Sequence, residues 1–191
     1  MNEDAAPTAE SAVPPITEAL RAEARAHPGG WVYAIDPGFD GAAGVPPQAV
    51  VGAWRSDARG ELSGSFVPNP RYVATPRARG WSLPGSELED TLQLTTSGYA
   101  SEEQLHRAFA SAEVVIYSRP EGGIFLAPAQ DHGELVYAFT TSAKASASGW
   151  SHLVTIGGAT LASSLPVGVR IALDPGSTPS GILDPERVVR P

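Results

Sequence analysis

Apolar residues early in the chain recur every four positions, with polar residues between them. Ile16, Leu20 and Ala24 would lie on one face of a helix, so this spacing predicts a helix that continues to Ala26. The sequence His-Pro-Gly-Gly at 27–30 ends it, because proline and glycine do not continue a helix.

Runs of β-branched and aromatic residues replace the helical spacing after residue 30. These strand-like runs span 31–35, 50–55 and 62–67. The turn-forming segment 56–61 joins the last two runs and predicts a hairpin. We expect Trp31, Trp54 and Phe66 to supply much of the core on one face of this sheet.

Two further helices are predicted from their N-terminal sequences. Ser86 and Glu89 form a capping-box pattern, and Ser101 and Gln104 repeat it further along the chain. Gly98 is expected to lie at the end of the earlier helix. The side chains expected to face inward from the two helices are Leu88, Leu92, Tyr99, Leu105 and Phe109.

Short strands alternate with turns and short helices in the second half of the chain. The expected strands are 114–117, 124–126, 135–139, 153–156 and 169–173. Turns with Gly122-Gly123 and Asp131-His132-Gly133 separate the first three, which predicts an antiparallel meander. Helices are expected over 159–164 and over 142–148, the latter behind the capping hydroxyls of 140–142. This mixture predicts an α+β fold, with a mixed, largely antiparallel sheet or sheets and short helices packed on one face.

The length of 191 residues suits one domain or two small ones. Residues 1–15 are rich in alanine, proline and acidic residues, and they predict a disordered acidic tail. We expect a β-rich N-terminal subdomain with flanking helices over 16–99 and an α+β domain over 100–191.

Charge and composition narrow the classes of partner and of chemistry. The net charge is −8, and an acidic surface repels phosphate backbones and anionic lipids, so nucleic acid is not an expected partner. The absence of cysteine excludes disulfides and thiol catalysis. The opening Met-Asn-Glu-Asp has no apolar core of a signal peptide, and no stretch reaches the roughly 20 apolar residues of a membrane helix. We expect a cytoplasmic protein without membrane insertion.

None of the catalytic and metal-binding templates is complete in this sequence. The four histidines form no close pair of the kind that zinc sites use. Residues 36–41 resemble the start of a calcium loop, but Gly38 and Pro47 stand where oxygen ligands belong. The neighbours Ser151 and His152 are too close in sequence to form a base-assisted pair, and no G-x-S-x-G is present. We therefore expect no enzyme activity, no catalytic residues, no cofactor and no metal.

Several motifs of turn and core residues resemble a known family. In the second half they are Val136–Ser142, Gly149, Gly158–Leu161 and Leu165–Gly176. In the first half they are Asp36-Pro37, Pro46-Pro47, Val51–Arg55, Gly60, Asn69–Tyr72, Gly80-Trp81 and Gly98-Tyr99. Over about residues 28 to 185 the chain resembles SseB-like proteins of the kind associated with actinobacterial type VII secretion. Asp174 stands where asparagine is typical of the family, and both residues suit a turn.

The resemblance implies an α+β fold and an association with a secretion system, with no catalytic residues to carry over. The expected function is that of a protein-binding adaptor, whose partner is a secretion-system component or a secreted substrate. The alternative is an immunity-type protein that neutralises a secreted toxin, since acidity suits a basic partner. Tyr72, Trp81 and Trp150 lie in irregular segments and are the candidate protein-binding residues.

Overall fold

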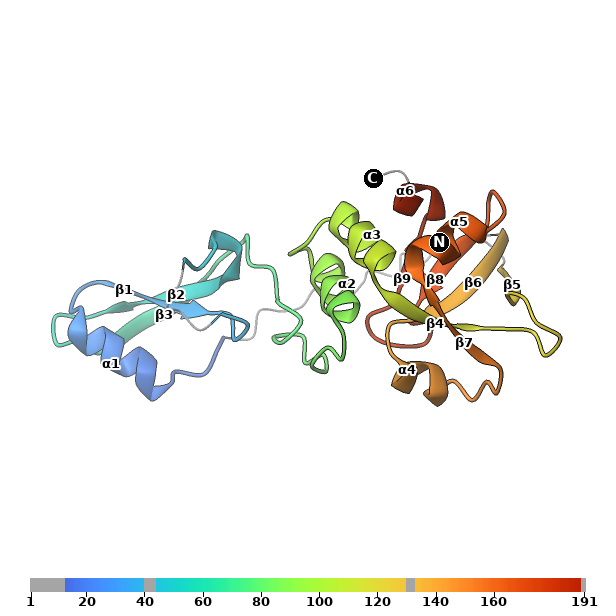
Figure 1. Ribbon diagram of the computed structural model, residues 1–191. Coiled ribbons are helices and arrows are strands. Elements are labelled where there is room, and N and C mark those ends of the chain that lie inside the picture. The colour runs from blue at the N-terminus through green and yellow to red at the C-terminus, as the bar shows by residue number, and fades with distance from the viewer. Residues whose placement is uncertain (1–12, 40–43, 130–132, 190–191) are drawn as a thin grey trace, which may run out of the picture. The chain divides into compact units, whose positions relative to one another are not determined.

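The computed structural model describes residues 13–39, 44–129 and 133–189. The chain folds into two compact units, residues 1–78 (unit 1) and residues 79–191 (unit 2) (Figure 1). This boundary corrects the expected one after residue 99. The helix that follows Ser86 belongs to unit 2, because Leu88 and Leu92 are buried in the core of that unit. Most of the expected tail, 1–15, lies outside the described residues.

In its described residues, unit 1 is a three-stranded antiparallel sheet with one α-helix and one 3-10 helix. Its elements are α1 (Glu18–Ala26), β1 (Trp31–Ile35), the 3-10 helix η1 (Pro47–Ala49), β2 (Val50–Ser56) and β3 (Leu62–Pro68). The strands pair in the order β1-β2-β3, and α1 contacts β1. The predicted helix and the three predicted strands are confirmed within two residues. Thr17 caps α1 by accepting a hydrogen bond from the amide of Leu20.

The register of β1 on β2 decides which aromatic residues of unit 1 are buried. Val32 lies opposite Trp54 and both are buried, whereas Trp31 lies opposite Arg55. Consecutive side chains of a strand point to opposite faces, so Trp31 and Trp54 lie on different faces of the sheet. The expectation that Trp31 joins the core is therefore wrong. Trp54 and Phe66 do pack together, with ring centroids 4.6 Å apart.

Unit 2 is an α+β unit built on a six-stranded mixed sheet. Its helices are α2 (Glu87–Ser97), α3 (Glu102–Ser111), α4 (Ser142–Ala147), α5 (Gly158–Ser164) and α6 (Pro185–Val189). Its strands are β4 (Glu113–Tyr117), β5 (Leu126–Ala129), β6 (Gly133–Phe139), β7 (Leu153–Gly157), β8 (Arg170–Leu173) and β9 (Gly181–Leu183). The strand order is β7-β4-β6-β8-β9, with β5 on β6. Only β6 and β8 pair in parallel among these strands, which confirms the mixed, largely antiparallel sheet.

Strands β4, β5 and β6 do not form the expected meander. β4 pairs with the last residues of β6, Val115 lying opposite Phe139, whereas β5 pairs with the first residues of β6. β7 occupies the other side of β4. β4 has four consecutive buried residues, which is typical of a central strand, whereas Pro128 in β5 lacks a backbone donor and suits an edge.

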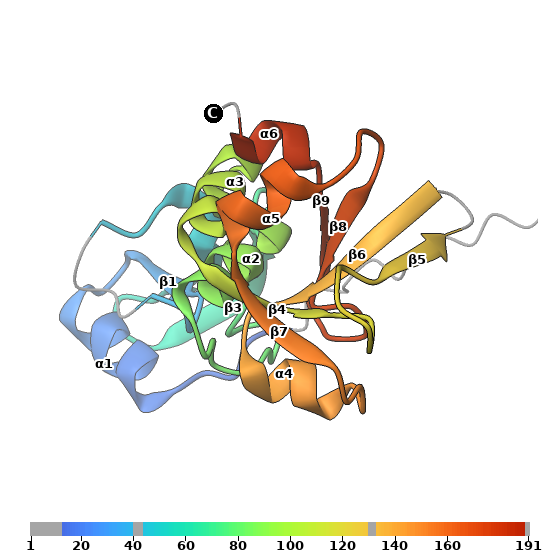
Figure 2. The ribbon, with the colours of Figure 1, turned by 45° about the vertical axis from the view of Figure 1, so that its right-hand side comes forward.

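The two faces of the sheet in unit 2 are covered by different helices. Helices α2, α3, α5 and α6 pack on one face, where Leu92, Phe109 and Leu161 join the core. Helix α4 lies on the opposite side of the sheet, where Ala145 packs among Val115, Tyr117 and Phe139 (Figures 1 and 2). This second face is rich in aromatic residues.

The two predicted capping boxes have different outcomes. At α3 both reciprocal bonds between Ser101 and Gln104 are present. At α2 the hydroxyl of Ser86 accepts from the amide of Glu89, but the Glu89 carboxylate accepts from Gly85 instead of completing the box. The side chain of Glu89 is directed to a charged cluster in the interior of unit 2. Gly98 ends α2 with φ 85°, as expected.

Candidate functional site

One face of the sheet in unit 1 exposes large apolar side chains. Trp31, Tyr33 and Val67 are 49%, 55% and 50% exposed. Tyr33 lies opposite Ala53, and Ala53 lies opposite Val67, so the three form one row across the sheet. Bulky side chains on the two outer strands therefore flank a small side chain on the central strand. We call Trp31, Tyr33, Ala53, Arg55 and Val67 the open face.

The open face contains a shallow hollow of about 300 Å³. The residues that line it are Trp31, Tyr33, Val50, Gly52, Ala53, Val67, Pro68 and Asn69. Its floor is made by small residues of β2. Gly52 cannot carry a side chain, because a Cβ atom at this position would overlap the Phe66 ring on the other side of the sheet.

Arg55 adds a positive charge to the open face. It is exposed, and it lies opposite Trp31 on β1 and Ser63 on β3. Within the described parts of the chain, its guanidinium has no carboxylate partner. The described residues of unit 1 hold six arginines and five acidic residues, one of which, Asp36, is buried. These described residues of unit 1 therefore carry no excess of negative charge.

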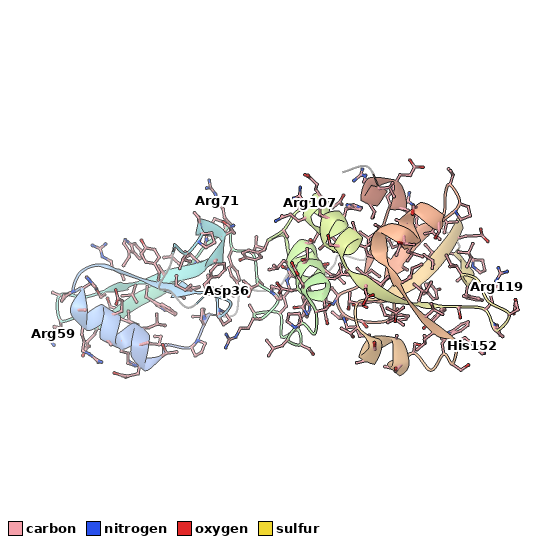
Figure 3. All side chains as sticks on the ribbon, in the orientation of Figure 1. Asp36, Arg59, Arg71, Arg107, Arg119 and His152 are labelled. Atoms are coloured by element: carbon pink, nitrogen blue, oxygen red, sulfur yellow. The ribbon has the colours of Figure 1, made fainter. Side chains whose placement is uncertain are left out.

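Asp36, at the end of β1, fixes the segment that follows the sheet (Figure 3). The carboxylate is fully buried and accepts hydrogen bonds from the Tyr72 hydroxyl at 2.8 Å and from the Thr75 amide at 3.1 Å. It also accepts from the Thr75 hydroxyl and from the Gly38 amide. Tyr72, a predicted binding residue, therefore uses its hydroxyl inside unit 1 while its ring is half-buried.

The hydrogen bonds to Asp36 make the stability of unit 1 depend on pH. Burial raises the pKa of this carboxyl, but the bonds from Thr75, Gly38 and Tyr72 outweigh burial and hold the pKa below its usual value. The contribution of Asp36 to stability is therefore complete above the unfolded pKa of about 4 and is lost as pH falls through the lower folded pKa.

We expect Asp36→Asn to weaken the acid dependence of the unfolding of unit 1, since asparagine carries no titrating carboxyl. Urea unfolding between pH 3 and 6, followed by the NMR signal of the Trp54 indole, measures this dependence. The exposed Glu61→Gln variant serves as the control. Equal pH slopes in the wild type and in Asp36→Asn would contradict the assignment.

A second buried charged group lies in unit 2. The Lys144 amine lies 2.7 Å from a Glu89 oxygen and 2.6 Å from an Asp174 oxygen. Asp174 is fully buried and also accepts from the amide and the hydroxyl of Thr140, at 2.8 Å and 2.7 Å. The cluster joins α2, the junction between β6 and α4, and the turn after β8.

The chemistry of this cluster is that of a structural ion pair. Burial lowers the pKa of the Lys144 amine, but hydrogen bonds and charge from Asp174 and Glu89 raise it more, so the pKa lies above its usual value. The amine is held protonated, and this form has no lone pair for nucleophilic attack. Thr141 caps α4, as expected for the hydroxyls at this junction, whereas the hydroxyl of Thr140 binds Asp174. The carboxylate of Asp174 therefore pairs with Lys144 in addition to suiting the turn after β8.

The other two predicted binding residues lie in unit 2, in different surroundings. Trp150 is 40% exposed and stacks on Tyr117, with ring centroids 4.3 Å apart and an interplanar angle of 17°. Trp81 is half-buried, and the guanidinium of Arg79 lies 5.5 Å from its ring centroid. Both rings have partners within the unit, and their role in binding stays a prediction.

The histidines in the described residues occupy separate positions. His27 lies 3.1 Å from Glu23 at the end of α1, and His106 is buried, its Nδ1 donating to the Glu102 carbonyl at 2.6 Å. The Asp131-His132 pair lies outside the described residues. Over 13–39, 44–129 and 133–189, no three histidine or acidic side chains converge as a metal site requires. In the same ranges, no helix combines the length and the apolar character needed to cross a bilayer.

Comparison with known proteins gives no relative for this chain. No family model, curated protein or solved structure matches it. Function is therefore inferred from the geometry of the open face, and the likeness to SseB-like proteins stays a prediction.

Proposed function

We propose that this chain is a non-enzymatic adaptor that binds a partner protein on the open face of unit 1. The observation that carries the proposal is the joint exposure of Trp31, Tyr33 and Val67 on one sheet face. Contiguous exposed apolar surface on a folded unit is typical of an interaction site, and tryptophan and tyrosine are the residues most often found at the centre of interfaces.

The open face is also held rigid before any partner binds. Its side chains stand on paired strands, and the Ser56 hydroxyl at the end of β2 donates to the His27 carbonyl at 2.8 Å. At the opposite end, the Asn69 amide group donates to the Val50 carbonyl at 2.7 Å. A rigid surface loses little conformational entropy on binding, so more of the contact energy is available for affinity.

The resemblance of the sequence motifs to SseB-like proteins supports a component or a substrate of a type VII secretion system as the partner. A secreted toxin, the immunity-type alternative, is favoured only by the charge of the whole chain. The charged residue of the open face is Arg55, which does not favour a basic toxin at this position.

We expect the double substitution Trp31→Ser and Tyr33→Ser to lower the affinity for the partner by about a hundredfold, because two aromatic anchors are lost. A photo-crosslinking residue in place of Val67 in the full-length chain, expressed in the native host, captures the partner for identification. The affinity of the purified pair is then measured by calorimetry for the wild type and the double variant.

Leu83→Ser is the matched control, since it removes an exposed apolar side chain from unit 2. Retained affinity in this variant supports the assignment to unit 1. Equal affinity of the wild type and the double variant would refute it. The identity of the captured protein distinguishes a secretion component from a toxin.

A further inference from the structure

We propose that the open face receives a proline-rich segment of the partner, in polyproline II conformation, with an acidic residue of that segment paired to Arg55. This inference rests on the proposed function and names the chemistry of the partner. It follows from the shape of the face, from the kind of side chains on it and from its charge.

The face offers side chains and no free main-chain groups along its centre. The central strand β2 is paired on both sides, by β1 and by β3. A ligand on this face therefore cannot extend the sheet, and its own backbone polar groups must be satisfied elsewhere. An α-helix satisfies them internally, and a polyproline II segment keeps them in water.

The width of the groove that runs along β2 on the open face, between β1 and β3, favours the polyproline II segment, which is the thinner of these two ligands. Two strand spacings separate β1 from β3, which is about 10 Å. An α-helix with its side chains is at least about 10 Å across, so it cannot settle between Tyr33 and Val67 onto Ala53. A single extended segment can.

The spacing of the aromatic residues matches proline rings. Trp31 and Tyr33 are two residues apart on one strand, so their side chains stand about 7 Å apart along the groove. Polyproline II rises about 3.1 Å per residue, so prolines two positions apart are about 6 Å from each other. Proline rings two positions apart can therefore pack on Trp31 and Tyr33, as in other aromatic grooves that hold proline-rich segments.

Charge complementarity fixes the remaining feature of the ligand. Arg55 lies beside Trp31 on the open face and has no carboxylate partner among the described residues. A second copy of this chain is a poor occupant, since a symmetric face-to-face contact would bring two Arg55 side chains into one apolar interface. A carboxylate in the bound segment supplies the missing partner.

The test uses the full-length chain and defined peptides. The first probes are octaproline peptides with two glutamates, placed at the N-terminal end in one peptide and at the C-terminal end in another. The second probes carry lysines in place of the glutamates. In the control peptides, alanine and glycine replace the prolines. Calorimetry and the NMR signal of the Trp31 indole measure binding. We expect the affinity for the glutamate–proline peptide to be at least about tenfold higher than that for the alanine–glycine control.

Substitutions at two positions, Trp31 and Arg55, locate the binding on the open face. Trp31→Ala is expected to weaken binding of the glutamate–proline peptide by about tenfold or more, and Trp31→Tyr to restore much of it. Arg55→Glu is expected to reverse the preference between glutamate and lysine peptides, because it reverses the charge at that end of the groove. Circular dichroism of each variant checks that unit 1 is folded.

Three outcomes would overturn the inference. The first is equal binding of the proline peptide and the alanine–glycine control. The second is peptide binding that neither Trp31→Ala nor Arg55→Glu changes. The third is a dimer in sedimentation that Trp31→Ala dissociates, which would make a second copy the occupant. If the crosslinked partner still depends on Trp31 and Tyr33 while the proline peptides fail, only the partner chemistry is wrong and the proposed function stands.

Discussion

Replacing Gly158 with alanine is expected to lower the free energy of unfolding of unit 2 by about 3 kcal/mol or more. Gly158 is buried at the start of α5, where its amide donates to the Ala112 carbonyl at 2.8 Å. A Cβ atom at this position would overlap the carbonyl oxygen of Phe109 and lie 2.8 Å from its carbonyl carbon. These are backbone atoms of α3, so the clash is relieved only by moving one helix away from the other.

The neighbouring glycine provides a matched control for this prediction. At Gly157 the nearest atom to an added Cβ is the Thr160 hydroxyl oxygen at 3.6 Å, which is an ordinary contact. Its φ of −66° suits any residue, so Gly157→Ala is expected to change stability by less than about 0.5 kcal/mol.

Hydrogen exchange of the β4 and α3 amides reports unit 2 alone and avoids the assumption that both units unfold together. In Gly158→Ala these amides are expected to exchange faster, while those of β2 in unit 1 keep their rates. Equal protection in the two glycine variants would show that α5 does not need this close approach to α3.

Replacing Asp174 with alanine is expected to destabilise unit 2 by about 3 kcal/mol. The substitution removes one of the two carboxylates around the Lys144 amine and leaves the buried amide of Thr140 without its acceptor. A buried cation that loses a partner costs more free energy than the ion pair contributes, because the cation remains out of water.

Asp174→Asn separates the charge from the turn. Asp174 has φ 51°, and asparagine accepts this backbone conformation more readily than alanine does. Its single amide oxygen, however, replaces only one of the two carboxylate oxygens, so it cannot serve both the Thr140 amide, which binds one oxygen of Asp174, and Lys144, which binds the other. A loss of about 2 kcal/mol is therefore expected. The exposed Asp184→Asn variant is the control.

A double-mutant cycle with Lys144→Met tests the coupling directly. In a chain that already carries Lys144→Met, the same Asp174→Asn substitution is expected to cost about 1 kcal/mol less, since no ammonium is left unpaired. Additive effects of the two substitutions would refute a role for the charge pair. Urea unfolding, with exchange of the β6 and β8 amides, gives the required free energies.

Most of the individual elements could be predicted from the sequence, because their signals are local. The box of Ser101 and Gln104 fixes the start of α3, and Gly98 ends α2 in the left-handed conformation. The missed elements were the 3-10 helix η1 and the strand β9, three residues each, and α6, five residues long. Segments this short contain too few residues to show a period.

The open face could not be predicted from the sequence, because apolar and polar residues do not alternate along β1. The run Trp-Val-Tyr-Ala-Ile at 31–35 is apolar at every position, so it does not show which face is buried. Pairing with β2 decides this by placing Val32 opposite the buried Trp54 and Tyr33 opposite Ala53. The site of the proposed function therefore depends on the register of two strands.

The charged cluster of unit 2 was missed for a related reason. Glu89, Lys144 and Asp174 are far apart in sequence, and each has a local explanation as a helix or turn residue. The fact that Lys144 is the only lysine of the chain was the one available signal, and it named no partner.

The sequence by itself determined where the chain turns, which segments become helices or strands, and the α+β class of the fold. Those features depend on caps, glycines and apolar spacing within a few residues. Only the tertiary structure decided the boundary after Ala78, the pairing of β4 with β6, the exposure of Trp31 and the partners of Lys144. The physical reason is that shifting a strand by one residue keeps its local propensity but moves every side chain to the other face, so only contacts between distant segments distinguish the registers.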